Sequence, residues 1–176
     1  PLDRAAFAGK GVIQPTLWES APGRVHMLLR STSGRVCRSD SADGGRTWSP
    51  AEATELANNN SGIDVERLPD GTLALCCNPV PADWGKRTPL VLIFSRDNGA
   101  TWGDQVVLED EDPPVDEARV KLDRAHRANE FSYPAVVWGG AGTGGGPALH
   151  IAYTWKRRSI AYRRMALAGY RLAAVL

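Results

Sequence analysis

The octet SADGGRTW occupies residues 41–48, and a second octet, SRDNGATW, occupies residues 95–102. Both fit the pattern Ser-x-Asp-x-Gly-x-Thr-Trp, and their first residues, Ser41 and Ser95, are 54 positions apart. So particular a pattern, repeated in a chain of 176 residues, indicates a structural unit that occurs more than once. The fold can be worked out from these two octets.

The sequence around the octets divides into three cycles, each with three apolar stretches separated by turns. The stretches are VIQPTLW, VHMLL and RVCRS, then SGIDVERL, TLALCC and LVLIF, then FSYPAVVW, ALHIAYTW and SIAYRRMAL. Their β-branched and aromatic residues favour strands, and the Pro, Gly and Asp clusters between them favour tight turns. Antiparallel strands repeating at about 50 residues are typical of the blades of a β-propeller.

We therefore predict an all-β chain that forms part of one propeller domain over residues 1–176, with blades at about 11–57, 58–112 and 129–170. Residues 113–128 connect the second and third blades. Their charges at helical spacing predict a solvated loop that carries a short helix. The tail AGYRLAAVL is a candidate closing strand.

The composition excludes several classes of function. Hydrophobic residues make up 43% of the chain, and the formal net charge is +1, which predicts no general attraction to nucleic acid or acidic membranes. Neither a membrane-spanning apolar run nor a secretory signal is visible in the sequence, which favours the cytoplasm. The first residue is Pro1 rather than methionine, so we expect the chain to be a piece of a longer one. The three cysteines and three histidines form no ligand motif, so we predict buried thiols, no metal and no cofactor.

The octets themselves are expected to do structural work. An Asp in such a turn can accept hydrogen bonds from the amides of its own loop, a Gly can take a positive φ, and a Trp can pack between blades. We assign this role to Ser41, Asp43, Gly45, Thr47, Trp48, Ser95, Asp97, Gly99, Thr101 and Trp102.

Strands that alternate in direction place the octet turns on one rim of the propeller and another set of strand ends on the opposite rim. The residues at those ends are unusually polar: Gln14, Arg30, Asn58, Asn59, Asn60, Ser61, Asn78, Trp84, Lys86, Arg87, Glu130, Phe131, Ser132, Tyr133, Trp155, Lys156, Arg157 and Arg158. Loops are polar in general, but Arg30 directly follows VHMLL and Arg87 directly precedes TPLVLIF, so strand ends hold both. Two guanidinium forks on one site would match a carboxylate.

The octets resemble Asp boxes, the BNR repeats of sialidases (neuraminidases), and the similarity extends from GVIQPTLWE to about IAYRRMAL. The resemblance implies a sialidase-like six-bladed β-propeller of which this chain supplies about three blades. In sialidases an arginine triad binds the substrate carboxylate, a Tyr assisted by a Glu attacks the anomeric carbon, and an Asp acts as acid. By motif, Arg30 in LLRSTSGRV and Arg87 in KRTPLVL are similar to the second and third arginines of the triad.

The chain departs from the family at the nucleophile, because Phe131 stands where the resemblance places the tyrosine. Tyr133, two residues on, is expected to share the strand face of Phe131, with its hydroxyl about 6–7 Å along the strand. Glu130 could act as base or nucleophile, or could be a solvated loop residue. We take Tyr133 and Glu130 as the catalytic candidates.

Three functions are consistent with these residues. The first is a glycoside hydrolase of the exo-sialidase type that acts on a terminal acidic sugar and is incomplete in this chain. The second is a non-catalytic carbohydrate-binding propeller, and the third is a protein-interaction propeller whose arginines are paired with neighbouring loops. The expected partner is a carbohydrate, and self-association is expected if the end sheets are uncovered. The proposed substrate-binding residues are Arg30, Arg87, Gln14, Asn60, Ser61, Asn78 and Trp155.

Overall fold

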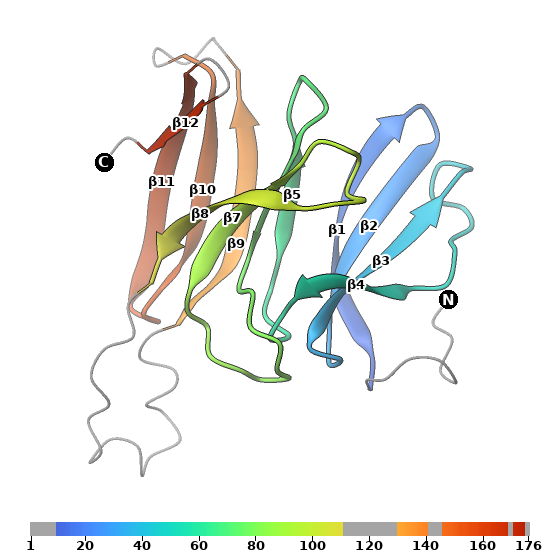
Figure 1. Cartoon of the computed structure of the whole chain (residues 1–176), viewed down its shortest axis with the longest axis horizontal. Helices are drawn as coiled ribbons and strands as arrows, with labels where there is room; N and C mark the ends of the chain where they lie inside the picture. The colour runs from blue at the N-terminus through green and yellow to red at the C-terminus, as the bar shows by residue number, and fades with distance from the viewer. Residues whose placement is uncertain (1–9, 111–129, 141–145, 169–170, 175–176) are drawn as a thin grey trace.

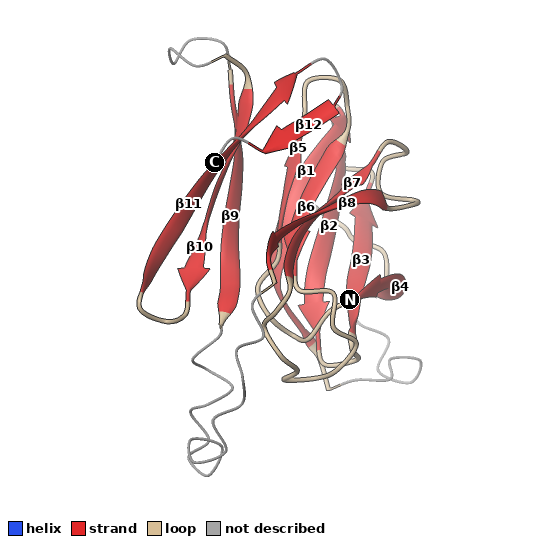
Figure 2. Ribbon diagram, turned by 60° about the vertical axis from the view of Figure 1, so that its left-hand side comes forward, coloured by secondary structure: helices blue, strands red, loops and turns tan. Residues whose placement is uncertain are grey.

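The structure, a computed structural model, describes residues 10–110, 130–140, 146–168 and 171–174 (Figure 1). Within these ranges the chain forms three four-stranded antiparallel sheets, and Figure 2 shows strands joined by loops and turns. The first sheet contains β1 (Val12–Ala21), β2 (Arg24–Ser31), β3 (Arg35–Ser41) and β4 (Glu52–Ala57) in that order. The predicted all-β, blade-like fold is confirmed.

The other two sheets repeat this arrangement. The second contains β5 (Asp64–Arg67), β6 (Leu73–Cys77), β7 (Leu90–Ser95) and β8 (Gly103–Glu109), and the third contains β9 (Phe131–Gly139), β10 (Ala148–Trp155), β11 (Ser159–Ala168) and β12 (Arg171–Ala174). The predicted tail strand is β12, which pairs with β11 as the fourth strand of the third sheet. The connection predicted at 113–128 lies outside the described residues.

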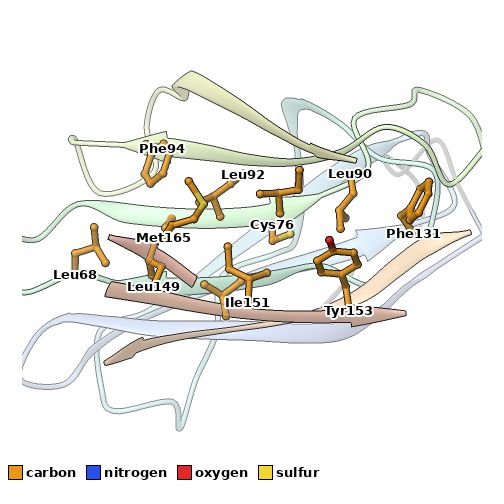
Figure 3. Close-up of a cluster of buried hydrophobic side chains, with 13 residues drawn as sticks. Leu68, Cys76, Leu90, Leu92, Phe94, Phe131, Leu149, Ile151, Tyr153 and Met165 are labelled. Atoms are coloured by element: carbon orange, nitrogen blue, oxygen red, sulfur yellow. The ribbon is translucent and has the colours of Figure 1, made fainter. Parts of the chain in front are cut away.

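The core consists of two layers of side chains between neighbouring sheets, and β6 contributes to both. Leu73, Leu75 and Cys77 face the cluster shared with the first sheet, whereas Ala74 and Cys76 face the cluster shared with the third (Figure 3). Because side chains alternate along a strand, a strand between two sheets is buried along its whole length, as β6 is. The predicted buried thiols are confirmed, and burial raises the pKa of Cys77 to about 12.

The octet turns are closed by their own aspartates. Asp97 accepts hydrogen bonds from the Thr101 amide at 2.8 Å and the Thr101 hydroxyl at 2.5 Å, and Asp43 accepts the same two bonds from Thr47. These hydrogen bonds lower the pKa of Asp43 and of Asp97 to about 2, and the bond from the threonine side chain makes the largest contribution. Gly45 has φ 85° and Gly99 has φ 80°. Trp102 packs against the cluster between the first two sheets, whereas Trp48 borders a hollow on the first sheet's outer face.

The second octet also fastens the first two sheets together through Asn98. Its Oδ1 accepts a bond from Trp18 Nε1 at 2.7 Å, its Nδ2 lies 3.2 Å from His26 Nε2, and its carbonyl accepts a bond from Arg38 at 2.9 Å. His26 also bonds to the Ser20 hydroxyl and the Asp40 carboxylate, and its ring stacks on Trp18. His26 therefore has a structural role at this junction.

Both end sheets carry apolar side chains that no described segment covers. Ile13 and Leu17 are exposed on the first sheet, and Val137, Ile160 and Tyr162 are exposed on the third. A propeller buries such faces between neighbouring blades, so these two sheets have the character of inner blades rather than end caps. The described part of the chain contains no helix with the length and apolar character that a membrane span requires.

Candidate functional site

The site lies at the beginnings of three neighbouring strands, β1, β5 and β9, on the rim opposite the octets. Asp64 at the start of β5 joins these strands, because its carboxylate accepts bonds from the Thr16 hydroxyl of β1 and the Val136 amide of β9, each at 2.7 Å. One carboxylate thus fixes the spacing of the strands that carry the candidate residues. Sequence analysis did not single out Asp64, because only the fold brings its partners to it.

Each of these strands begins near a residue with left-handed backbone. The φ values are 50° at Gln14, 59° at Asn60 and 50° at Tyr133, a region that residues other than glycine rarely adopt. Gln14 and Tyr133 also lie at irregularities in strand pairing, opposite Arg30–Leu29 and Ala152–Thr154 respectively. A bulge redirects a side chain, and strained residues cluster at functional sites, so Gln14 and Tyr133 are candidates for contact with a ligand. Asn60 is buried, and its Nδ2 donates to Asp83.

Tyr133 lies beside both predicted arginines. The guanidinium carbon of Arg87 is 5.3 Å from the centre of the Tyr133 ring. Hydrogen bonding from Arg87, followed by hydrogen bonding from Arg30, lowers the pKa of Tyr133 below its usual value despite partial burial. The residue remains 47% exposed. The structure therefore brings two cations and an accessible phenol together.

Gly62 makes room for this phenol. A Cβ at Gly62 would lie 3.1 Å from Cδ1 of Tyr133 and 3.4 Å from its Cα. The distance of 3.1 Å is tighter than ordinary van der Waals contact, so a larger residue would require the tyrosine ring to shift by a few tenths of an ångström. The residue is a component of the site that sequence analysis missed.

Arg30 presents unused hydrogen-bond donors. The residue is 8% exposed, near the end of β2, and its buried Nε and Nη1 have no hydrogen-bond partner among the described residues. Leaving donors of a charged group unpaired and away from water is costly, so such groups normally have partners. Asn60 Oδ1 and Thr88 Oγ1 are likewise buried without a partner in the described chain. The arrangement is suited to an anionic ligand with additional hydroxyl groups.

Glu130 is a buried ionic partner rather than a solvated loop residue. It is 2% exposed, and its carboxylate accepts bonds from Arg87 Nη1 at 3.1 Å, from Ser132 Oγ at 2.5 Å and from Arg157 Nε. Burial raises the pKa of Glu130, but the bonds from Ser132 and Arg157 and the charges of both arginines outweigh burial, so the pKa is lowered overall. The carboxylate is therefore ionised and orients Arg87.

Phe131 and Tyr133 do not share a strand face, contrary to the sequence-based expectation. Phe131 is fully buried in the cluster between the second and third sheets, as Figure 3 shows, whereas Tyr133 is exposed. The irregular pairing of β9 with β10 and the positive φ of Tyr133 interrupt the alternation between them. Tyr133, not residue 131, is the side chain that reaches the arginines.

The remaining predicted residues differ in their surroundings. Ser61 donates to Asn78 Oδ1 at 2.6 Å, and Asn78 donates to the carbonyls of Pro89 and Phe131, so both side chains are buried and engaged within the protein. Trp155 packs against the core, and the centre of its ring lies 4.6 Å from Lys156 Nζ. Gln14 is exposed next to Ile13, which pairs with Arg30.

A shallow hollow of about 480 Å³ opens beside the tyrosine and is lined by Glu130, Tyr133, Thr154, Arg157, Ser159 and Ile160. Arg157 enters the site from the turn between β10 and β11 and was not among the assigned binding residues, although the run KRR at 156–158 marked that turn as cationic. Over the described residues, no three His, Cys, Asp or Glu side chains are grouped as a metal site requires.

Fold and site together define an arc of a β-propeller with an arginine-lined rim. The chain belongs to the BNR repeat-like family, since the BNR repeat-like domain matches residues 3–151. No curated protein matches the sequence.

Two solved structures share this architecture. The NanB sialidase from Streptococcus pneumoniae, in complex with 2-[(3-chlorobenzyl)ammonio]ethanesulfonate, matches with a TM-score of 0.56 and 14% identity over 80% of this chain and 20% of that one. The α-L-arabinanase of Penicillium chrysogenum, complexed with arabinobiose, matches with a TM-score of 0.56 and 18% identity over 88% of this chain and 45% of that one. This chain therefore spans less than half the length of either protein.

Proposed function

We propose that the intact protein acts on a terminal acidic sugar and that this chain supplies the part of the site that binds the carboxylate. The observation that carries the proposal is Arg30, whose buried Nε and Nη1 have no partner in the described chain. Arg87, the second cation beside Tyr133, is held by Glu130. A carboxylate would accept from Arg30 in the paired geometry that guanidinium groups favour.

The chemistry that fits these residues is glycoside hydrolysis with a tyrosine nucleophile. The arginines favour the phenolate of Tyr133, which would bond to the anomeric carbon as the bond to the leaving oxygen breaks. The leaving oxygen takes up the proton that the phenol released. Water then adds its hydroxyl group to the anomeric carbon as the sugar–tyrosine bond breaks, and its remaining proton restores the phenol. Glu130 acts as a positioning residue for Arg87 rather than as the nucleophile. The carbohydrate class is supported by the BNR repeats and by neighbours named as a sialidase and an arabinanase.

The second candidate function is a carbohydrate-binding propeller without catalysis. It is favoured by Phe131, which stands in the core where the family resemblance places the nucleophile. A protein-interaction propeller would need both arginines to be paired with neighbouring loops, and Arg87 alone forms such a pair, with Glu130, in the described structure.

Turnover and binding, measured on the full-length protein, separate these candidates. Fluorogenic glycosides of N-acetylneuraminic acid and galacturonic acid test hydrolysis, and calorimetry with the two free acids tests binding. We expect hydrolysis of at least one glycoside and its loss in Tyr133→Phe protein. Binding without turnover would select the carbohydrate-binding propeller, and the absence of both would reject the acidic-sugar site.

A further inference from the structure

Two loops from different sheets bring cations to the same edge of the site. Lys86 and Arg87 lie in the loop between β6 and β7, and Lys156, Arg157 and Arg158 form the turn between β10 and β11. We call these five residues the cationic rim. Asp83 also lies in the first loop, bonded to Asn60, so the rim has more positive than negative side chains.

The loops are tied together at Glu130 by side-chain and backbone bonds. Arg87 bonds to one carboxylate oxygen and Arg157 to the other, while the Phe131 amide donates to the Arg87 carbonyl and the Lys156 amide to the Glu130 carbonyl. Glu130 is buried, whereas Arg157 is 45% exposed and Lys86 and Arg158 are exposed. One internal anion thus holds two of the five rim cations, Arg87 and Arg157, in place, and the Arg157 side chain still reaches solvent.

The backbone of the β10–β11 turn conflicts with its sequence. Lys156 has φ 51° and Arg157 has φ 53°, and the Arg158 amide donates to the Trp155 carbonyl at 3.0 Å. A turn with two such central residues strongly favours Asn-Gly, because other side chains are strained there. The corresponding turn of the first sheet, between β2 and β3, has Gly34 at φ 78°. Strain retained in a turn that borders the candidate site points to a function for the side chains that cause it.

We propose that the cationic rim binds further anionic units of a polyanionic carbohydrate, so that the preferred ligand is a chain with carboxylate or sulfate groups on successive sugars. This inference rests on the acidic-sugar site proposed above. Arg30 and Arg87 hold the terminal acid, and the exposed Arg157 lines the hollow beside Tyr133. Arg158 is exposed and Lys156 is half-buried in the same turn. The charge is local, since the whole chain has a net charge of +1.

Calorimetry with galacturonic acid and hexagalacturonate tests the proposal on the full-length protein. We expect the hexamer to bind about 10-fold more tightly than the monomer at low salt, and the difference to shrink at 1 M salt, where the Debye length is about 3 Å. Equal affinities at low salt would overturn the rim proposal and leave the acidic-sugar site standing. If neither compound nor N-acetylneuraminic acid binds, the proposed function itself fails.

Single variants separate the rim from the site. Lys156→Asn and Arg158→Gln should each weaken hexamer binding several-fold and leave monomer binding unchanged, whereas Arg46→Gln, an exposed arginine on the octet rim, should change neither. Lys156→Asn should also raise the melting temperature because Asn tolerates positive φ, so weaker binding could not be attributed to unfolding. Unchanged hexamer binding in both rim variants would contradict the proposal. Equal binding of hexathymidylate would show a nucleic-acid or general polyanion surface and would overturn it too.

Discussion

Nη1 of Arg87 lies 3.1 Å from Oε1 of Glu130, and this ion pair joins the second sheet to the third at the candidate site. The carboxylate is almost fully buried, and it also accepts hydrogen bonds from Ser132 and Arg157, so groups of the protein itself balance its charge. The pair therefore links the stability of the fold to the orientation of an arginine that the proposed ligand would contact.

Replacing this carboxylate should destabilise the protein. In Glu130→Gln protein, Arg87 and Arg157 lose their shared counter-charge, and we expect the free energy of unfolding to fall by roughly 3 kcal/mol, since breaking a buried pair is costly. Urea denaturation measures the loss. Ser132→Ala, which removes one neutral donor to the same carboxylate, should cost about 1 kcal/mol. A Glu130→Gln protein as stable as Ser132→Ala would contradict this role.

The same carboxylate should make stability depend on acid pH. The folded-state pKa of Glu130 is lowered from 4.5, so its stabilisation is fully present above pH 4.5 and is lost as the pH falls through the lowered folded pKa. The melting temperature of the parent should therefore drop more steeply below pH 4.5 than that of Glu130→Gln. Parallel curves for the two proteins would show that the ion pair does not set this dependence.

Gly62 provides a test of how Tyr133 is placed. In Gly62→Ala, the added Cβ would meet the tyrosine ring at 3.1 Å, so the ring should shift away from Arg87 and the pKa of Tyr133 should rise toward its usual value. Ultraviolet titration, with Tyr133→Phe protein subtracted, measures that pKa. Gly103→Ala is the matched control, because nothing lies within 4 Å of its added Cβ. An unchanged titration in Gly62→Ala would mean that the glycine is not needed here.

Asn98 should matter for the junction between the first two sheets. Asn98→Ala removes the partners of Trp18 and His26 and places alanine at φ 58°, so we expect a loss of about 2–3 kcal/mol in unfolding free energy. Asn98→Gly removes the same side chain but relieves the backbone, and should be about 1 kcal/mol more stable than Asn98→Ala. If both variants match the parent, the octet does not fasten the sheets through this residue.

The octets and the apolar stretches predicted the three sheets because their patterns are local. Asp43 and Asp97 close their turns with neighbours four residues away, so the sequence carries the whole arrangement. The outer strands β4 and β8 follow the octets and were not among the apolar stretches identified in the sequence. They lie at sheet edges, exposed for much of their length, and have no apolar alternation to detect.

The site was predictable only in part. Strand-end positions and family resemblance indicated Arg30 and Arg87. That Tyr133 rather than Phe131 lies beside these arginines depends on a bulge in β9. One signal was present, since proline follows both Gln14 and Tyr133, and the two residues share φ 50°. The pairing of Glu130 with Arg157, 27 residues apart, arises from two loops meeting, which no local pattern encodes.

We propose that Arg30 and Arg87 converge to bind the carboxylate of a sugar. This binding is measured by calorimetric titration of galacturonic acid and N-acetylneuraminic acid into the parent and Arg30→Met proteins. We expect the parent to bind at least one acid and the variant to bind it about 10-fold or more weakly, because hydrogen bonds to a charged group are worth roughly 1.5–3 kcal/mol. If the variant binds that acid as tightly as the parent does, Arg30 does not hold the carboxylate.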